Sequence, residues 1–169
     1  MFARKNAHHH QVAYVTNDIT RAIALFEKNY ASPGFFLFNN VATGAAKPGD
    51  PELRIALSHV NGVEIELIEP VGDTAPLFSD GLLQGLELEI RFHHIAIRID
   101  GPIENWEAHV ASINTAHHPI VYQGSLGEDL RYIYTDERSC VGHYVEHVWM
   151  SARVLEQIAA ARPSFPPRG

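Results

Sequence analysis

The amino-acid sequence contains the same pattern twice, once in each half. In the first copy, Gln11 opens the apolar stretch Gln-Val-Ala-Tyr-Val, and Glu66 follows 55 residues later in Glu-Leu-Ile-Glu-Pro. In the second copy, His94 opens His-Ile-Ala-Ile-Arg, and Glu146 follows 52 residues later in Glu-His-Val-Trp. A repeat of about 80 residues is typical of a duplicated supersecondary unit. We therefore expect two related modules.

Size and charge exclude several classes of protein. The chain has 169 residues, of which 46% are hydrophobic, enough for one packed domain or two small halves that share a core. Its net charge is −7 and its Lys and Arg residues do not cluster, which argues against a nucleic-acid partner. Cys140 is the only cysteine, so an intramolecular disulfide and a cysteine-based zinc site are excluded.

The sequence also argues against a membrane partner. No stretch reaches the roughly 18 apolar residues that a membrane helix needs. Residues 1–10 lack the apolar core of a signal peptide and end in three histidines. We therefore expect a cytoplasmic protein.

Hydrophobic periodicity predicts one strand, one helix and three further strands in a first module over residues 8–71. Asn17-Asp18 is an N-cap signal before an amphipathic helix over residues 19–30. Asn61-Gly62 is a strong hairpin signal. The predicted strands cover residues 12–16, 35–38, 53–59 and 63–69, and a loop rich in Gly, Ala and Pro covers residues 42–51.

The second module, over residues 92–150, repeats this order after a connection at residues 72–91. Residues 76–84 suit a short helix, whereas the sequence leaves residues 85–92 undecided. Apolar residues at helical spacing mark the next helix at Ile103, Trp106, Val110 and Ile113. The predicted strands cover residues 95–99, 119–123, 130–135 and 142–150, with a turn at 137–139. Residues 151–169 should form a terminal helix and, from residue 163, a frayed tail.

The repeated polar residues point to a metal site. Side chains alternate across a strand, so Gln11 shares its face with Ala13, and His94 shares its face with Ala96. The small alanines leave room there for a ligand. Buried carboxylates and imidazoles are costly unless they are paired or bind a metal. The alternative is four unrelated polar residues on half-exposed strands, but the repeated order favours a metal site made by Gln11, Glu66, His94 and Glu146.

His10 is an alternative to Gln11 as the first metal ligand. The two side chains point to opposite faces, and aligning the two copies places Gln11 opposite His94 and His10 opposite His93. We favour Gln11 on this ground, and we interpret the run His8 to His10 as a solvated entry to the strand. An amide, an imidazole and two carboxylates form a hard donor set that suits one divalent ion of Zn, Co, Ni, Mn or Mg.

The chain resembles the vicinal oxygen chelate superfamily, which includes glyoxalases, bleomycin-resistance proteins and extradiol dioxygenases. The resemblance rests on His94-Ile-Ala-Ile, Glu66-Leu-Ile-Glu-Pro and Tyr144-Val-Glu146, and it covers residues 8–150. It implies an α+β fold in which two βαβββ modules form a curved eight-stranded cup around one divalent metal. His94, Glu66 and Glu146 match the family's ligand positions. Gln11 stands where histidine is commonest, although some epimerase-like members place an amide among their ligands.

The resemblance further implies a metal-dependent lyase or isomerase. Its substrate would be a small carbonyl compound or an acyl thioester, whose enediolate or enolate the metal stabilises. Glu146 or Glu66 would act in alternation as ligand and base. Tyr144 shares its face with Glu146, and Arg131 or Tyr132 could contact the substrate from the neighbouring strand. The superfamily also suggests a homodimer.

Two other functions remain open from the sequence. A metal-free binding protein of the bleomycin-resistance type would use the same cup to hold an aromatic or cationic ligand. An extradiol-type dioxygenase would need a site with two histidines and one carboxylate, and so would need His10 in place of Gln11.

Overall fold

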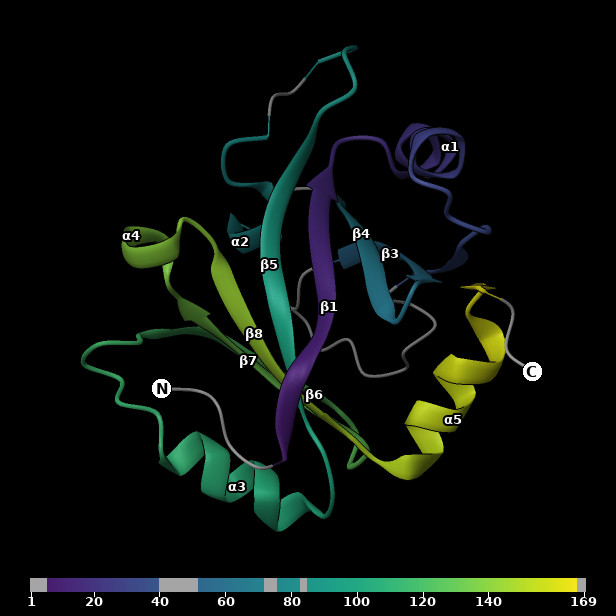
Figure 1. Cartoon of the computed structure of the whole chain (residues 1–169). Helices are drawn as coiled ribbons and strands as arrows, with labels where there is room; N and C mark the ends of the chain where they lie inside the picture. Colours follow the sequence, from purple (N-terminus) through teal and green to yellow (C-terminus); the bar gives the residue numbers. More distant parts are fainter. Residues whose placement is uncertain (1–5, 40–51, 72–75, 83–84, 167–169) are drawn as a thin grey trace. The chain divides into compact units, whose positions relative to one another are not determined.

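The computed structural model describes residues 6–39, 52–71, 76–82 and 85–166. The loop expected over residues 42–51 lies outside the described residues, as do parts of the connection at 72–91. Figure 1 shows the elements, which follow one another as β1 (Ala7–Thr16), α1 (Ile19–Asn29), β2 (Phe36–Asn39), β3 (Glu52–Val60), β4 (Val63–Val71), α2 (Pro76–Ser79), β5 (Ile90–Ile99), α3 (Ile103–Ala111), β6 (Ile120–Leu126), β7 (Leu130–Asp136), α4 (Arg138–Val141), β8 (Tyr144–Met150), α5 (Ala152–Ala161) and β9 (Ser164–Phe165). This order confirms the α+β class and the repeated βαβββ arrangement.

The chain divides into two compact units. The N-unit contains residues 12–93 and 161–169, and the C-unit contains residues 1–11 and 94–160. Strands β1 and β5 each contribute residues to both units. Contacts define these units, whereas the order of elements defines the predicted modules, so the module boundaries at 8–71 and 92–150 stay a prediction.

In the N-unit, the strands follow the order β2-β3-β4-β1. Helix α1 begins where the sequence predicts, because the Asp18 carboxylate accepts a hydrogen bond from the backbone N–H of Arg21 at 3.0 Å. The apolar face of the helix packs on β3 and β4, in a core cluster of Ile19, Ala22, Phe26, Ala56 and Leu67.

The predicted hairpin joins β3 to β4. Val60 pairs with Val63, so the turn consists of Asn61 and Gly62, whose φ angles are 51° and 88°. Two consecutive residues with positive φ form the kind of tight turn whose twist matches that of the strands. The hairpin fixes which β4 residues lie opposite β3, and it places Glu66 opposite Leu57.

In the C-unit, the strands follow the order β5-β8-β7-β6. Strands β5 and β8 are parallel and lie side by side (Figure 1), whereas β7 is antiparallel to both β8 and β6. The periodic residues of α3 pack on one face of this sheet. The core cluster there consists of Ile99, Trp106, Ile133 and Trp149.

Three sequence predictions need correction. Residues 164–165 do not fray but form β9, which pairs with β3, and the backbone N–H of His59 donates to the Pro163 carbonyl at 3.0 Å. Strand β2 pairs with β3 only as far as Leu57, which leaves the following residues of that edge for β9. The turn expected at 137–139 is the short helix α4, and the helix expected at 76–84 ends at Ser79. No helix in the described part of the chain is long and apolar enough to cross a membrane.

Candidate functional site

The C-unit sheet has two faces with different chemistry. In the register of β5 and β8, His94 lies opposite Tyr144 and Ala96 opposite Glu146. Alternation therefore places these four residues on one face, which we call the site face. The residues between them belong to the other face, where Ile99 and Trp149 pack under α3.

His94 and Glu146 come together on the site face. The Nε2 atom of His94 lies 3.5 Å from the Oε2 atom of Glu146, and their side chains are 0% and 12% exposed. This distance is longer than a hydrogen bond of about 2.7–3.2 Å. Two such atoms that approach without bonding each other could be two ligands of one ion.

Two neighbours hold His94 in place. The ring of Tyr134 meets the imidazole edge to face, with centroids 5.0 Å apart and an interplanar angle of 84°. Ala96 is fully buried two residues along the same strand, directly opposite Glu146. The room that the small alanine side chains were expected to leave for a ligand stays a prediction.

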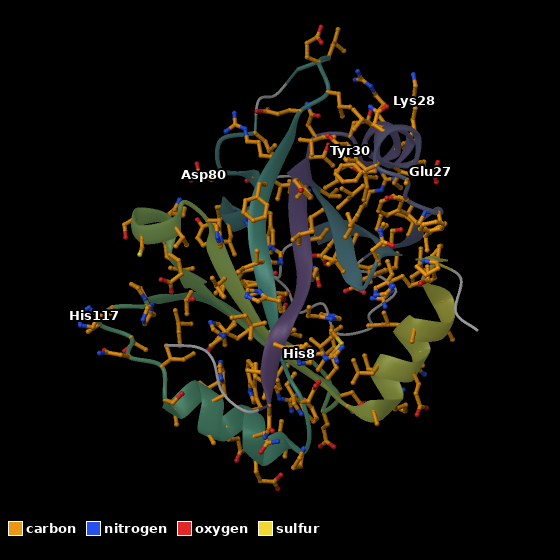
Figure 2. The ribbon with its side chains drawn as sticks, in the orientation of Figure 1. His8, Glu27, Lys28, Tyr30, Asp80 and His117 are labelled. Atoms are coloured by element: carbon orange, nitrogen blue, oxygen red, sulfur yellow. The ribbon has the colours of Figure 1, made fainter. Side chains whose placement is uncertain are left out.

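Gln11 and His10 lie in different surroundings. Gln11 is buried in β1, as are Ala13 and Val15 at the next alternating positions. His10 is half-buried, and Arg98 donates to its Nδ1 atom at 3.3 Å. A guanidinium beside His10 makes that side chain a poor ligand for a second cation. His8 continues the run on the same strand (Figure 2) and pairs with Asp100.

Glu66 belongs to the N-unit and is half-buried in β4. Its neighbour on the same strand face, Glu64, is 2% exposed and forms an ion pair with Arg162 of the C-terminal segment. Sequence reasoning missed this pair, because Arg162 follows the predicted terminal helix in a segment with no pattern of its own.

The donors available for a metal ion are therefore few. Among the residues that the structure describes, no three His, Cys, Asp or Glu side chains gather closely enough to hold one. The C-unit supplies an imidazole and a carboxylate from His94 and Glu146, and it also contains the buried amide of Gln11. These donor types fit a hard divalent cation.

The three residues predicted to contact substrate lie in different places. Tyr144 is buried on the site face, where the Arg138 guanidinium covers its ring at 4.7 Å from the centroid. Tyr132 lies opposite Val148, also on the site face. Arg131 lies opposite Trp149, on the other face, and donates to the Leu130 carbonyl at 3.0 Å and to the Gly127 carbonyl. Its contacts stabilise the turn between β6 and β7.

Arg138 is a charged group that sequence reasoning missed on the site face. Its guanidinium donates twice to Asp136, at 2.9 and 2.7 Å, and these bonds hold the pKa of the Asp136 carboxyl below its usual range. Asp136 lies opposite Tyr144. The end of the site face beyond Tyr144 therefore carries a fixed pair of opposite charges.

A separate histidine pair lies under α3. His109 and His147 are buried and their rings share a hydrogen bond of 2.9 Å between Nε2 and Nδ1. The other ring nitrogen of His147 lies 3.4 Å from the Thr135 hydroxyl. Burial lowers the pKa of His147 to about 3, helped by the charges of His109 and His118. His147 thus stays neutral, in a structural position on the face away from Glu146.

Comparison with known proteins identifies what this chain resembles. A family model described as the glyoxalase/bleomycin resistance protein/dioxygenase superfamily matches residues 10–134. No curated protein matches the chain.

Several solved structures have a similar fold. Methylmalonyl-CoA epimerase from Mycobacterium tuberculosis is 17% identical, with a TM-score of 0.59 over 92% of this chain and 97% of that one. A hypothetical protein from Bacillus halodurans is 14% identical, with a TM-score of 0.59 over 87% and 96%. A Streptomyces coelicolor methylmalonyl-CoA epimerase in complex with 2-nitronate-propionyl-CoA is 15% identical, with a TM-score of 0.56 over 86% and 95%. These identities establish the fold alone.

Proposed function

The chain belongs to the glyoxalase/bleomycin resistance protein/dioxygenase superfamily, and from this premise we propose that it is a divalent-metal-dependent lyase or isomerase. The substrate is a small carbonyl compound or an acyl thioester whose enediolate or enolate is stabilised. The similar epimerase structures support this class, because one of them is in complex with 2-nitronate-propionyl-CoA.

One observation carries the proposal. A buried imidazole and a nearly buried carboxylate converge at 3.5 Å, from two neighbouring parallel strands. Two such groups are costly to desolvate side by side, and a shared cation is one arrangement that offsets the cost. His94, Glu146 and Gln11 would hold the ion. Glu66, which the family pattern adds, stays a ligand predicted from sequence.

The chemistry divides between the ion and the chain's own residues. A bound divalent cation would act as a Lewis acid on a carbonyl oxygen. Glu146 would take the proton from the carbon next to that carbonyl and return it. This role is supported by the 12% exposure of its side chain, whereas the His94 side chain is fully buried. Tyr134 positions the His94 ring. Glu66 is the alternative base.

One observation favours a second candidate, a metal-free binding protein. Among the described residues, no third carboxylate or imidazole joins His94 and Glu146, and the ring of Tyr134 contacts the imidazole. A small aromatic or cationic ligand could bind such a face without reaction. We do not propose the dioxygenase, because His10 faces the Arg98 guanidinium.

Metal content tests the proposal. We expect about one divalent ion per chain in untagged protein purified without a nickel column, measured by mass spectrometry, and we expect His94→Ala and Glu146→Gln to lose it. Metal binds only the folded state, so both variants should also lose the thermal stabilisation that added metal gives the wild type.

Two controls make the result specific. His117→Ala changes an exposed histidine (Figure 2) and should retain the ion. Replacing His8, His9 and His10 with Ser should also retain it, and loss there would move the first ligand to His10. No metal in the wild type, even after dialysis against Mn, Co, Ni and Zn, would reject the enzyme proposal in favour of the binding protein.

A further inference from the structure

Three tyrosines form a continuous aromatic surface in the C-unit. Tyr122 comes from β6, and Tyr132 and Tyr134 come from β7. Their ring centroids are 5.9 Å apart for Tyr122 and Tyr132, 6.0 Å for Tyr122 and Tyr134, and 6.2 Å for Tyr132 and Tyr134. These separations lie within the range of favourable aromatic contacts. We call this cluster the aromatic wall.

The aromatic wall adjoins the candidate site. Tyr134 lies opposite Glu146 across β7 and β8, and its ring contacts the His94 imidazole at 5.0 Å. Tyr122 lies opposite Tyr134 across β6 and β7. Directly opposite residues share a sheet face. The rings therefore lead from the His94 and Glu146 pair to the edge strand β6 on the site face.

Gly124 makes room for this arrangement. It lies opposite Tyr132, and a Cβ atom added to Gly124 would collide with the phenol ring of Tyr132. Its backbone has no positive φ that would call for glycine. The glycine is therefore needed for space, since it lets the Tyr132 ring lie across the backbone of β6.

Burial along the aromatic wall is graded. Tyr134, next to the site, is 4% exposed, whereas Tyr122 and Tyr132 are half-buried and keep part of their rings accessible. The accessible rings meet at interplanar angles of 41° for Tyr122 with Tyr132 and 85° for Tyr132 with Tyr134. A flat ring can pack against such a surface face to edge.

Charge favours an uncharged or anionic ring over a cationic one. Aromatic faces also attract cations. A cationic group this close to a divalent ion on His94 and Glu146 would, however, be repelled by it. A conjugated ring on the carbon next to the reacting carbonyl meets no such repulsion, and its conjugation also spreads the charge of the enolate.

On the basis of the proposed function, we propose that the aromatic wall determines substrate specificity and that the substrate is a carbonyl compound with an aromatic or other flat conjugated ring on the carbon next to the reacting carbonyl. Glu146 acts at the carbon next to the carbonyl, and Tyr122 and Tyr132 hold the ring. Gly124 is a positioning residue, which acts through Tyr132.

Binding of two related probes tests this proposal. Phenylpyruvate carries a ring and pyruvate does not, and each affinity is measured by calorimetry on the intact protein. We expect wild type to prefer phenylpyruvate. Tyr132→Leu should weaken the binding of phenylpyruvate about tenfold, which is the size of one lost aromatic contact. It should leave the affinity for pyruvate unchanged. Gly124→Ala should also weaken the binding of phenylpyruvate, because it displaces the Tyr132 ring. Tyr132→Phe keeps the ring and should bind both probes with the affinities of wild type.

Tyr30→Leu is the matched control, because Tyr30 is 57% exposed at the end of α1, in the N-unit (Figure 2). The Tyr30→Leu variant should bind both probes with the affinities of wild type. Equal binding of the two probes by wild type, or an equal loss for both probes in Tyr132→Leu, would overturn the proposal. Binding of phenyltrimethylammonium in preference to phenylpyruvate would also overturn it, in favour of a cation site.

A second readout separates this proposal from the proposed function. Deuterium exchange at the carbon next to the carbonyl, followed by NMR in heavy water, reports proton transfer. Equal acceleration of the two exchange reactions, each relative to its own rate without protein, would reject the aromatic wall as a specificity determinant and leave the enzyme proposal intact. Selective binding of phenylpyruvate without exchange would support the aromatic wall and reject proton transfer.

Discussion

The eleven histidines of this chain differ in what burial allows them to do. His94 is fully buried next to a carboxylate, and His147 is fully buried next to another imidazole and a hydroxyl. His118 is only part-buried and bonds the Glu137 carboxylate at 2.9 Å. The same side chain can therefore be a candidate ligand, a neutral structural group or an ion-pair partner, and its partners decide which.

The His147 pKa predicts a pH-dependent stability. Its imidazole titrates near 6.5 when unfolded and near 3 when folded, so the folded protein binds fewer protons between these values. The contribution of a neutral His147 to the free energy of unfolding is fully present above pH 6.5 and is lost as the pH falls towards 3. The free energy of unfolding should fall by about 1.4 kcal/mol per pH unit within that window from this residue.

Urea denaturation at pH 7.5, 6, 5 and 4 measures this effect as a difference between wild type and His147→Leu. We expect the variant to be less stable at pH 7.5, because His109 loses its partner, but to have a shallower pH dependence. Parallel pH profiles for the two proteins would show that His147 is not the source.

At the scale of the elements, a few local signals account for most of the fold. Asp18 caps α1, and the periodic residues of α1 and α3 are those that pack in the two core clusters. Strands β1 and β5 are longer than their apolar runs predict, because polar residues at their ends also pair within the sheet. Hydrophobic periodicity and turn residues depend only on residues that are close in sequence, so the folded chain contains the elements that they predict.

The hairpin turn gives an element-scale prediction. Gly62 has a φ of 88°, and nothing lies within 4 Å of an added Cβ atom, so Gly62→Ala tests backbone strain alone. We expect a loss of about 1–2 kcal/mol in the free energy of unfolding, measured with urea. Gly85 has the same open space without a positive φ, and Gly85→Ala should change stability by less than about 0.5 kcal/mol. Equal effects of the two substitutions would contradict this reasoning.

At the scale of the whole chain, residues near its C-terminus complete the N-unit. Arg162 pairs with the buried Glu64, and Ser164 lies 3.0 Å from the Nδ1 atom of His59. The Arg162 and Glu64 side chains are 8% and 2% exposed, so the pair lies almost entirely out of water.

A homodimer, suggested by the superfamily resemblance, stays a prediction that a measurement of molar mass in solution can test.

Breaking this ion pair should destabilise the protein strongly. Arg162→Met removes the guanidinium from a buried carboxylate, and we expect a loss of about 3–5 kcal/mol in thermal or urea unfolding. Replacing both partners, as Arg162→Met with Glu64→Gln, should recover most of it. Arg153 pairs with Asp129 at the surface, with 61% of its side chain exposed, and Arg153→Met should destabilise the protein far less than Arg162→Met does. A small effect of Arg162→Met would mean that Glu64 does not depend on Arg162.

The sequence by itself determined the repeated order of strands and helices, the hairpin and the helix cap. These features follow from patterns within a few residues, or from one pattern that occurs twice. Only the tertiary structure decided the partners. It put His94 and Glu146 on one strand face and Tyr134 beside His94, and it packed Tyr122 and Tyr132 against Tyr134. It also turned Arg131 to the other face, paired His109 with His147, and paired Arg162 with Glu64. These contacts join residues far apart in the chain, where strand register and packing set which side chains meet, and no local pattern records that choice.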